Sequence, residues 1–495
     1  MTETHIPASV REFVDRLTPS TGIFIDNTGQ AGDDGRSFPV NDPATGTPIT
    51  HLADASPRQA LLAVDAAHAA LPGWSATPPR ERAELLRASF AAMIEAADEL
   101  AGLMSWEMGK ALPDARGEAA YAAEFFRWFA EEAVRNEGNY GSSPAGGTRT
   151  IVTHHPVGVA ALVTPWNFPA AMATRKIAPA LAAGCTVLVK PAKETPLTAL
   201  AIAQLMAQAG VPAGVVNVVP TSSSASVVTP WLDDPRVRKL SFTGSTEVGR
   251  LLLRQAADRV INCSMELGGN APFVVAADAD VEAAVAGAML AKFRNGGQAC
   301  TAANRFYVHE SVAQQFTQRF GAAVEALQVG PAFAEGVDIG PLINPGARDD
   351  VAAMVDAALA QGARVAYRSP LPDALGSAFY PPTILLDVAP DTAIVGTEIF
   401  GPVAPIVTWR NESDLLTWVN DTEVGLAAYV YSGNLGWALR FAEQIEAGMV
   451  GINRGIVSDP AAPFGGMKQS GLGREGAREG IREFQETQYF SVAWP

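Results

Sequence analysis

Short apolar segments alternate with helical segments from residue 157 onward, and this alternation limits the possible fold more than any other feature of the chain. A first series of predicted strands comprises Val157–Thr164, Thr186–Val189, Val215–Val219 and Lys239–Phe242. Helices such as Pro196–Gln208 are predicted between them, and the helix Thr246–Ala256 follows the last strand. Apolar strands separated by helices are typical of a parallel sheet covered on both faces, which is the usual nucleotide-binding architecture.

A second series of the same kind follows Gly268-Gly269-Asn270. Its predicted helices are Val281–Ala291, Ser311–Leu327 and Ala347–Gln361, and its predicted strands are Arg305–Val308, Val403–Val407, Leu426–Tyr431 and Met449–Asn453. Because 495 residues are too many for one hydrophobic core, we interpret the two series as two α/β domains.

The segments outside the two series have simpler patterns. Turn formers dominate residues 1–55, whereas residues 57–136 are helical, with apolar residues at helical spacing over 80–109. Gly138–Pro144 is interpreted as a connector, and Thr148–Thr153 is β-branched enough for an edge strand. Gln488–Trp494 is predicted to be a short strand that would suit the sheet of an oligomer, although a frayed tail is equally compatible.

Composition argues against several classes of function. The net charge of −16 argues against a nucleic-acid partner. No apolar run is long enough for a membrane span, and Met1–His5 does not begin a signal peptide. Cys185, Cys263 and Cys300 are too widely spaced for a disulfide framework or a CxxC metal site, which indicates a reducing cytoplasm. We expect His154-His155 at the surface rather than at a metal, because neighbouring strand residues face opposite ways.

Cys300 is the candidate nucleophile, since it closely follows the glycine pair Gly296-Gly297. A thiolate is the strongest nucleophile among side chains at neutral pH, and glycines let a substrate approach the backbone. A buried structural cysteine is the commoner alternative, so the assignment depends on the other motifs.

Other candidate groups stand at the ends of predicted strands. Ser241–Gly249 closes a strand and opens a helix whose free N–H groups suit a pyrophosphate, although a plain turn has the same pattern. Glu266 is either a desolvated base or a solvated loop acid. Asn167 is either an oxyanion donor or a turn residue. Lys190 either reaches a cofactor ribose or phosphate or remains solvated.

Together these segments resemble the aldehyde dehydrogenase superfamily over nearly the whole chain and in the family's order. The matching motifs are TPWNFP (Thr164–Pro169), KPA (Lys190–Ala192), FTGSTEVG (Phe242–Gly249), ELGG (Glu266–Gly269), GQAC (Gly297–Cys300), EIFGP (Glu398–Pro402) and PFGGMKQSGLGREG (Pro463–Gly476). The resemblance implies two Rossmann-type domains with parallel sheets and a small β element for oligomerisation. We therefore expect an NAD(P)-binding domain (1–136 and 156–267), a catalytic domain (268–464) and an oligomerisation element (137–155 and 475–495).

The resemblance also implies a role for each candidate residue. Cys300 would attack the aldehyde, its backbone N–H and the Asn167 amide would hold the oxyanion, and hydride transfer to the nicotinamide would leave a thioester. Glu266 would activate the water that releases the acid. We also expect Lys190 to be one of the catalytic residues. The implied cofactor contacts are Trp166, Lys190, Ala192, Lys193, Gly244, Ser245, Gly249, Glu398 and Phe400, and no metal is required.

Within the superfamily the sequence is most similar to succinate-semialdehyde dehydrogenases, which bind the remote substrate carboxylate with two arginines and a serine. Arg175, Arg294 and Ser458 match these residues, so succinate semialdehyde is the expected substrate. Glutarate semialdehyde, a small neutral aldehyde and a non-catalytic scaffold protein remain alternatives.

The resemblance extends to cofactor preference, regulation and assembly. Lys193 stands where NAD-preferring relatives carry an acidic residue, so we expect NADP in preference to NAD, with Glu194 as a competing neighbour. Ala302 replaces the second cysteine of several relatives, which excludes a disulfide switch at that position. We expect a cytoplasmic homodimer or homotetramer.

Overall fold

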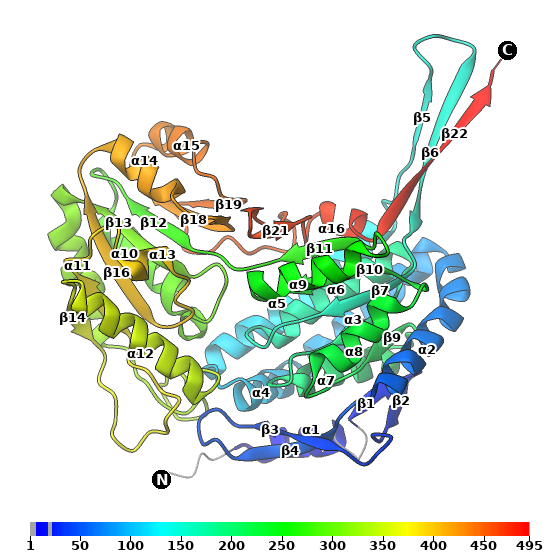
Figure 1. Cartoon of the computed structure of the whole chain (residues 1–495), viewed down its shortest axis with the longest axis horizontal. Helices are drawn as coiled ribbons and strands as arrows, with labels where there is room; N and C mark the ends of the chain where they lie inside the picture. Colours follow the sequence, from blue (N-terminus) through cyan, green and yellow to red (C-terminus); the bar gives the residue numbers. More distant parts are fainter. Residues whose placement is uncertain (1–5, 18–21, 495) are drawn as a thin grey trace.

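The computed structural model describes residues 6–17 and 22–494. The described chain is organised around an eight-stranded and a seven-stranded sheet, each covered by helices (Figure 1). A three-stranded sheet, which includes the last strand of the chain, projects from the side of the eight-stranded one (Figure 1). The predicted α/β class is confirmed.

The eight-stranded sheet has the order β2-β1-β9-β8-β7-β10-β11-β21. Its strands are β1 (Ile23–Ile25), β2 (Thr28–Gln30), β7 (Val159–Val163), β8 (Thr186–Lys190), β9 (Val216–Val218), β10 (Val237–Thr243), β11 (Asn262–Glu266) and β21 (Gly471–Leu472). The strands from β9 to β11 run parallel, whereas β1 and β21 join them in antiparallel orientation. In β7, Ala160 and Leu162 belong to one core and Ala161 and Val163 to the other, so both faces are buried.

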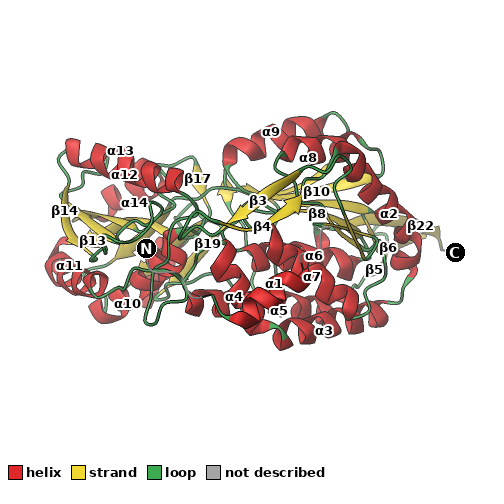
Figure 2. Cartoon of the chain, turned by 90° about the horizontal axis from the view of Figure 1, so that it is seen from below, coloured by secondary structure: helices red, strands yellow, loops and turns green. Residues whose placement is uncertain are grey.

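Helices cover both faces of this sheet, as its continuous apolar strands predict (Figure 2). One layer contains α2 (Pro57–Ala76), α8 (Ser224–Asp233) and α9 (Thr246–Ala257). The other contains α3 (Pro79–Glu95), α4 (Ala97–Glu107), α5 (Leu112–Ala133), α6 (Pro169–Ala183) and α7 (Pro196–Gln208). The helical pattern of residues 80–109 corresponds to two helices, because Ala96 leaves the helical conformation between α3 and α4.

The seven-stranded sheet has the order β14-β15-β16-β13-β12-β18-β19. Its strands are β12 (Ala271–Val275), β13 (Ala303–His309), β14 (Arg364–Arg368), β15 (Thr383–Leu386), β16 (Val403–Trp409), β18 (Ala427–Tyr431) and β19 (Met449–Ile452). The helices α10 (Val281–Phe293) and α11 (Glu310–Glu325) cover one face. The other face is covered by α12 (Pro345–Ala360), α13 (Ala393–Gly396), α14 (Glu412–Asn420) and α15 (Leu435–Ala442).

The projecting sheet consists of β5 (Asn139–Ser142), β6 (Thr148–Pro156) and β22 (Gln485–Ala493), in the order β22-β6-β5. The prediction of Thr148–Thr153 as an edge strand is wrong, because β6 pairs with a strand on each side. The predicted connector Gly138–Pro144 contains β5, and the C-terminal segment is a paired strand rather than a frayed tail.

Several shorter elements complete the described chain. They are α1 (Ala8–Leu17), the paired strands β3 (Ser37–Asn41) and β4 (Pro48–Ala53), the paired strands β17 (Val424–Gly425) and β20 (Met467–Lys468), and α16 (Glu479–Arg482). No helix in the described ranges is both long and apolar enough to cross a membrane. The prediction made for Met1–His5 falls outside the described residues.

Candidate active site

Four neighbouring parallel strands, β8, β7, β10 and β11, end at one edge of the eight-stranded sheet. Lys190 is the last residue of β8, Asn167 follows β7, Gly244-Ser245 follows β10, and Glu266 is the last residue of β11. Parallel sheets present functional groups at these carboxyl ends, so the topology gathers candidates that are far apart in sequence.

A cavity of about 260 Å³ lies at this edge, and the nucleophile candidate forms part of its wall. Its lining residues are Pro165, Trp166, Asn167, Phe168, Met172, Thr243, Gly244, Ser245, Leu267, Gly268, Cys300, Glu398 and Phe400. Ser245 caps α9 by accepting a hydrogen bond from the Val248 N–H, while the buried Thr243 hydroxyl has no partner among the described residues. A helix N-terminus beside an unpaired hydroxyl fits a bound pyrophosphate.

The aromatic wall of this cavity is held in an unusual backbone conformation. Phe400 has a φ of 50°, which is a strained value for a bulky residue, and its ring meets the edge of Trp166 at a centroid distance of 5.5 Å. Strain of this kind is typical of functional sites. The arrangement leaves Phe400 facing the same cavity as Cys300.

The loop that carries Cys300 connects α10 to β13 through the short helix η1 (Arg294–Gly297). Asn295, Gly296 and Gly297 all have positive φ values, and a Cβ on Gly297 would collide with the carbonyl of Gly401. The glycine pair therefore serves a left-handed turn pressed against the neighbouring EIFGP segment. From the sequence we expected these glycines to let a substrate approach the backbone. The structure shows that they also let two backbone segments pack closely together.

The Cys300 thiol is half-buried, and burial raises its pKa to about 12. The negative charge of Glu398 adds to this increase, whereas Arg175 and Arg294 oppose it. The thiol is therefore protonated at neutral pH in this state, so the reaction requires a group that removes its proton.

Glu266 is buried, with 3% of its surface exposed, and its Oε2 has no hydrogen-bond partner among the described residues. Burial raises the pKa of this carboxyl well above its usual value, and the neighbouring Glu475 raises it further. Lys176 and Arg175 lower it. A buried carboxyl with a raised pKa and a free oxygen is suited to exchange protons near neutral pH.

Three hydrogen bonds hold the loop that carries Asn167 in place. The Asn167 side-chain amide donates to the Gln298 carbonyl at 2.9 Å, which leaves its second N–H for another acceptor. The Asn167 backbone carbonyl accepts from Lys110 Nζ at 2.8 Å and from Asn295 Nδ2 at 2.9 Å. The oxyanion candidate is thus tied directly to the nucleophile loop.

Lys110 and Glu118 support this loop, and sequence reasoning missed both. They form an ion pair whose side chains are 0% exposed. Glu118 Oε1 also accepts hydrogen bonds from the N–H groups of Ala170 and Ala171, at the start of α6. Nothing in their sequence context distinguishes these charges from those of an exposed helix; burial and the shared partner reveal them.

Three separate motifs meet at Glu398. The Gly269 N–H donates to Glu398 Oε1 at 3.2 Å, and a Cβ on Gly268 would approach Glu398 Oε2 to 2.7 Å. A Cβ on Gly269 would approach the Cys300 carbonyl to 2.5 Å. Burial raises the pKa of Glu398 to about 7. The glycines of the ELGG motif therefore allow the segment that carries Glu266 to pack against both the Cys300 loop and the segment that carries Glu398.

A second cavity, also of about 260 Å³, contains two of the three predicted carboxylate-binding residues. Arg294 and Ser458 line it together with Asp114, Glu118, Tyr121 and Phe168. Phe168 also lines the cavity of Cys300, so the two cavities share a wall.

Arg175, the third predicted residue, does not line this cavity but contacts Tyr121, which does. It is 2% exposed, its guanidinium centre is 4.0 Å from the centre of the Phe464 ring, and Nη1 lies 3.6 Å from Glu475. Its Nη2 donates to the Tyr121 hydroxyl at 2.7 Å.

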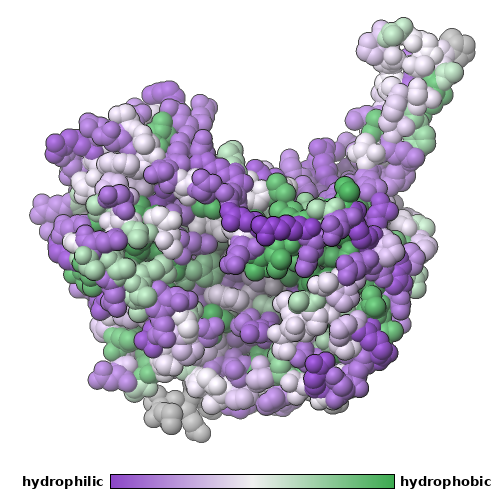
Figure 3. Space-filling model, viewed as in Figure 1, coloured by the Kyte–Doolittle hydropathy of each residue, from purple (hydrophilic) through white to green (hydrophobic). Residues whose placement is uncertain are grey.

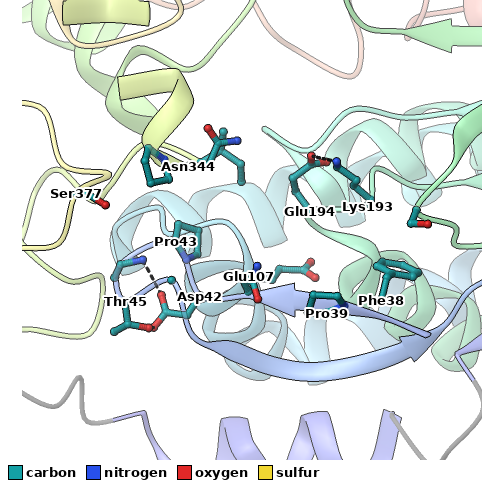
Figure 4. Close-up of a pocket in the computed structure, with 16 residues that line it drawn as sticks. Phe38, Pro39, Asp42, Pro43, Thr45, Glu107, Lys193, Glu194, Asn344 and Ser377 are labelled. Carbon is teal, nitrogen blue, oxygen red and sulfur yellow. Dashed lines mark hydrogen bonds and ion pairs between the residues drawn. The ribbon is translucent and has the colours of Figure 1, made fainter. Parts of the chain in front are cut away.

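The remaining cofactor candidates lie around β8. Burial lowers the pKa of Lys190 to about 8, and Ala192 is buried. Gly249 lies in the first turn of α9, where a Cβ would approach a Leu267 methyl carbon to 2.5 Å. Lys193 is exposed, 4.0 Å from Glu194, and both line a cavity of about 410 Å³ that extends to β3 and the start of α12 (Figure 4).

No cluster of three or more His, Cys, Asp or Glu side chains in the described ranges could hold a metal ion. His154 and His155 lie on β6, where they contact Thr487 and Thr153 respectively. All three cysteines are free thiols.

Known proteins with similar sequences are aldehyde dehydrogenases. A succinate-semialdehyde dehydrogenase of Paenarthrobacter nicotinovorans is 56% identical over 90% of this chain and 99% of that protein. A glutarate-semialdehyde dehydrogenase of Pseudomonas aeruginosa is 47% identical over 95% of this chain and 97% of that protein. A succinate-semialdehyde dehydrogenase [NADP(+)] of Escherichia coli is also 47% identical, over 93% and 95% of the two chains.

Solved structures agree with this relationship. A succinate-semialdehyde dehydrogenase from Burkholderia pseudomallei has a TM-score of 0.94 and 46% identity, covering 97% of this chain and 99% of that one. A betaine aldehyde dehydrogenase from Staphylococcus aureus in complex with NAD+ has a TM-score of 0.94 at 30% identity, covering 98% of both chains. The model of the aldehyde dehydrogenase family matches residues 30–490. The resemblance predicted from the motifs is confirmed, and the chain belongs to the aldehyde dehydrogenase family.

Proposed function

We propose that this enzyme oxidises succinate semialdehyde to succinate, with NADP or NAD as the hydride acceptor. The main supporting observation is that Arg294 and Ser458 line a cavity that shares Phe168 with the cavity of the Cys300 thiol. This arrangement suits a substrate that has an aldehyde at one end and a carboxylate at the other. The Cys300 thiol would react with the aldehyde, and the Arg294 guanidinium would bind the carboxylate. The relatives that act on succinate semialdehyde support this choice, and the glutarate-semialdehyde relative makes a longer semialdehyde the second candidate.

In the first chemical step, the Cys300 thiol gives its proton to water, and its Sγ bonds to the aldehyde carbon. The carbonyl oxygen gains negative charge, which the second N–H of the Asn167 amide and the Cys300 backbone N–H stabilise. A nicotinamide held by Glu398 and Phe400 would supply the hydride acceptor, and loss of hydride from this carbon leaves a thioester on Cys300. Glu266 takes a proton from the attacking water, the carbon–sulfur bond breaks, and the thiolate and the acid are released.

The residues of the Cys300 cavity fit a dinucleotide. Ser245 and the start of α9 would hold the pyrophosphate, and Glu398 and Phe400 would hold the nicotinamide ribose and ring. We propose that NADP is preferred, because the exposed Lys193 ammonium can pair with a 2′-phosphate. Glu194 competes for this ammonium, so the preference should be moderate. The Lys193→Glu variant should shift the preference toward NAD, and a wild-type preference for NAD of about tenfold or more would contradict this assignment.

We further propose a cytoplasmic homo-oligomer in which the projecting sheet contacts a second copy, and we retain the domain boundaries stated above. Tyr489, Phe490 and Trp494 are 58%, 42% and 50% exposed on or beside β22. Apolar residues also mark the outer surface of this sheet in Figure 3. Exposed aromatic side chains on a protruding sheet are typical of an interaction surface.

The decisive experiment compares succinate semialdehyde, glutarate semialdehyde and butanal as substrates of the wild type and of Arg294→Ala, with both cofactors. A charge-assisted hydrogen bond contributes about 1.5–3 kcal/mol, so Arg294→Ala should lower kcat/KM for succinate semialdehyde roughly ten- to hundredfold. The value for butanal should change by less than about twofold. A wild type that prefers butanal, or equal losses on both substrates, would overturn the assignment.

A further inference from the structure

Ser470 lies where the chain returns from the seven-stranded sheet to the edge of the eight-stranded sheet. The strand before it, β20, pairs with β17, which directly precedes β18, whereas the strand after it, β21, pairs with β11. The chain crosses in the other direction at residues 267–270, between β11 and β12. Ser470 is 0% exposed, and the motif that contains it gave it no expected role.

Ser470 ties the two crossings together. Its Oγ donates to the Gly268 carbonyl at 2.7 Å, and its backbone carbonyl accepts from the Leu267 N–H at 2.9 Å. The same Oγ accepts from the Gly425 N–H at 2.8 Å. Because a serine hydroxyl has one proton to donate, these contacts direct that proton to the Gly268 carbonyl.

The Gly268 carbonyl and the Gly269 N–H belong to one planar peptide group. This N–H donates to Glu398 Oε1 at 3.2 Å. Ser470 and Glu398 therefore bind opposite sides of the same peptide. Every donor in this series points toward Glu398, from the Gly425 N–H through the Ser470 hydroxyl to the Gly269 N–H, and hydrogen bonds aligned in this way polarise one another.

A peptide between two glycines depends on such contacts for its orientation. Neither Gly268 nor Gly269 has a Cβ that would restrict rotation of the peptide about the neighbouring backbone bonds. The Ser470 side chain, in contrast, is packed tightly, since a Cβ on Gly466 would collide with the Cβ of Ser470. A fixed hydroxyl thus holds a peptide that its own residues leave free to turn.

We propose that Ser470 is a positioning residue for hydride transfer, which holds the Gly268-Gly269 peptide so that its N–H fixes Glu398 against the nicotinamide ribose. Ser470 does not line the Cys300 cavity, so it acts through this peptide and not by contact with the substrate or the cofactor. The inference rests on the role proposed above for Glu398, and it holds for whichever aldehyde the enzyme oxidises.

The first test is Ser470→Ala, which removes the hydroxyl and keeps the backbone bond to Leu267. We expect the rate of the NAD(P)H burst to fall about three- to thirtyfold and the KM of the cofactor to rise about two- to tenfold, because Glu398 is held less firmly. An activated ester such as p-nitrophenyl acetate acylates the Cys300 thiol without a hydride acceptor. Hydrolysis of this ester should change by less than about twofold.

Ser432→Ala is the matched control. Ser432 is 4% exposed, donates to Asp278 Oδ1 at 2.8 Å and accepts from the Asn434 N–H at 3.0 Å. Its loss should lower the melting temperature, while the burst rate and ester hydrolysis stay within about twofold of the wild type. If Ser470→Ala does not fold, Ser470→Cys is measured in its place. A thiol fills the space and donates more weakly, so the burst should slow by a smaller factor with ester hydrolysis again unchanged.

The second test is a double-mutant cycle of Ser470→Ala with Glu398→Ala. If Ser470 acts through Glu398, Ser470→Ala should change the burst rate by less than about twofold in the Glu398→Ala background. Additive losses would overturn the inference, as would an unchanged burst rate in folded Ser470→Ala or an equal loss of ester hydrolysis. A wild type that prefers a neutral aldehyde would contradict the proposed substrate alone, because the burst can then be measured with that aldehyde.

Discussion

Glu118→Gln should slow the acylation step without changing any residue that touches the reacting atoms. Glu118 accepts three hydrogen bonds: from Lys110 Nζ and from the N–H groups of Ala170 and Ala171. A glutamine keeps the shape and one acceptor oxygen, but it leaves the buried ammonium of Lys110 without its counter-charge. Breaking a buried ion pair costs about 3–5 kcal/mol of folding stability.

The catalytic effect follows from the same geometry. Lys110 is one of two donors to the Asn167 carbonyl, and Asn295 remains as the second at 2.9 Å. Complete loss of an oxyanion donor lowers kcat about 10²- to 10³-fold, which is the upper limit here. Because Asn295 still holds the loop, we expect a loss of roughly ten- to hundredfold.

The assay is the rate of the NAD(P)H burst after rapid mixing, measured beside thermal unfolding. The melting temperature should fall by roughly 3–10 °C, since the shift per kcal/mol shrinks as the chain grows longer. Glu124→Gln is the matched control, because Glu124 lies on the same helix but pairs with Arg127 at the surface. A folded Glu118→Gln enzyme whose burst rate stays within twofold of the wild type would refute this reasoning, as would equal losses in Glu124→Gln.

Two further predictions concern the reacting groups. Glu266→Gln should keep a burst of NAD(P)H but slow the later hydrolysis by roughly 10²-fold or more, and an unchanged steady-state rate would remove Glu266 from the mechanism. Because the pKa of Cys300 is raised to about 12, the thiolate fraction grows about tenfold per pH unit below that value. The burst rate should therefore rise with pH between about 6 and 9, and a plateau below pH 7 would contradict the assigned proton state.

The sheets could be predicted from local sequence because their strands are buried on both faces. The expected strand Lys239–Phe242 lies inside β10 (Val237–Thr243), and Pro196–Gln208 agrees with α7 at both ends. The wrong prediction was the edge position of Thr148–Thr153. Local sequence shows that a segment favours a strand, but the second partner of β6 is β22, more than 300 residues later. Pairing at that separation leaves no local pattern.

The residues of the candidate site also fall into two groups: those that local sequence predicts and those that only the packing of distant segments reveals. Motifs at strand ends, such as those of Asn167 and Glu266, could be found because glycines and prolines mark the turns that carry them. Lys110 and Glu118 could not, because their importance comes from burial against α6 rather than from their neighbours in sequence. Arg175 was found, but its hydrogen bond to Tyr121 depends on how α5 and α6 pack together.

Salt should increase activity toward an acidic aldehyde, although we propose that arginines bind the substrate carboxylate. The whole chain carries a net charge of −16, which repels an anionic substrate over long distances. Arg294 is half-buried and Arg175 is 2% exposed, so dissolved ions screen these local charges much less than the surface field. The Debye length falls from about 30 Å at 0.01 M salt to about 8 Å at 0.15 M, and surface repulsion should weaken over that range. We expect kcat/KM for succinate semialdehyde to rise about two- to fivefold, with saturating cofactor, while the value for butanal stays constant. Sodium chloride and choline chloride should give the same curve, because the effect depends on ionic strength and not on one cation. A fall in kcat/KM with added salt would mean that the arginines dominate the electrostatic potential at the entrance of the cavity. The negatively charged surface would then be too distant to affect how fast the substrate binds.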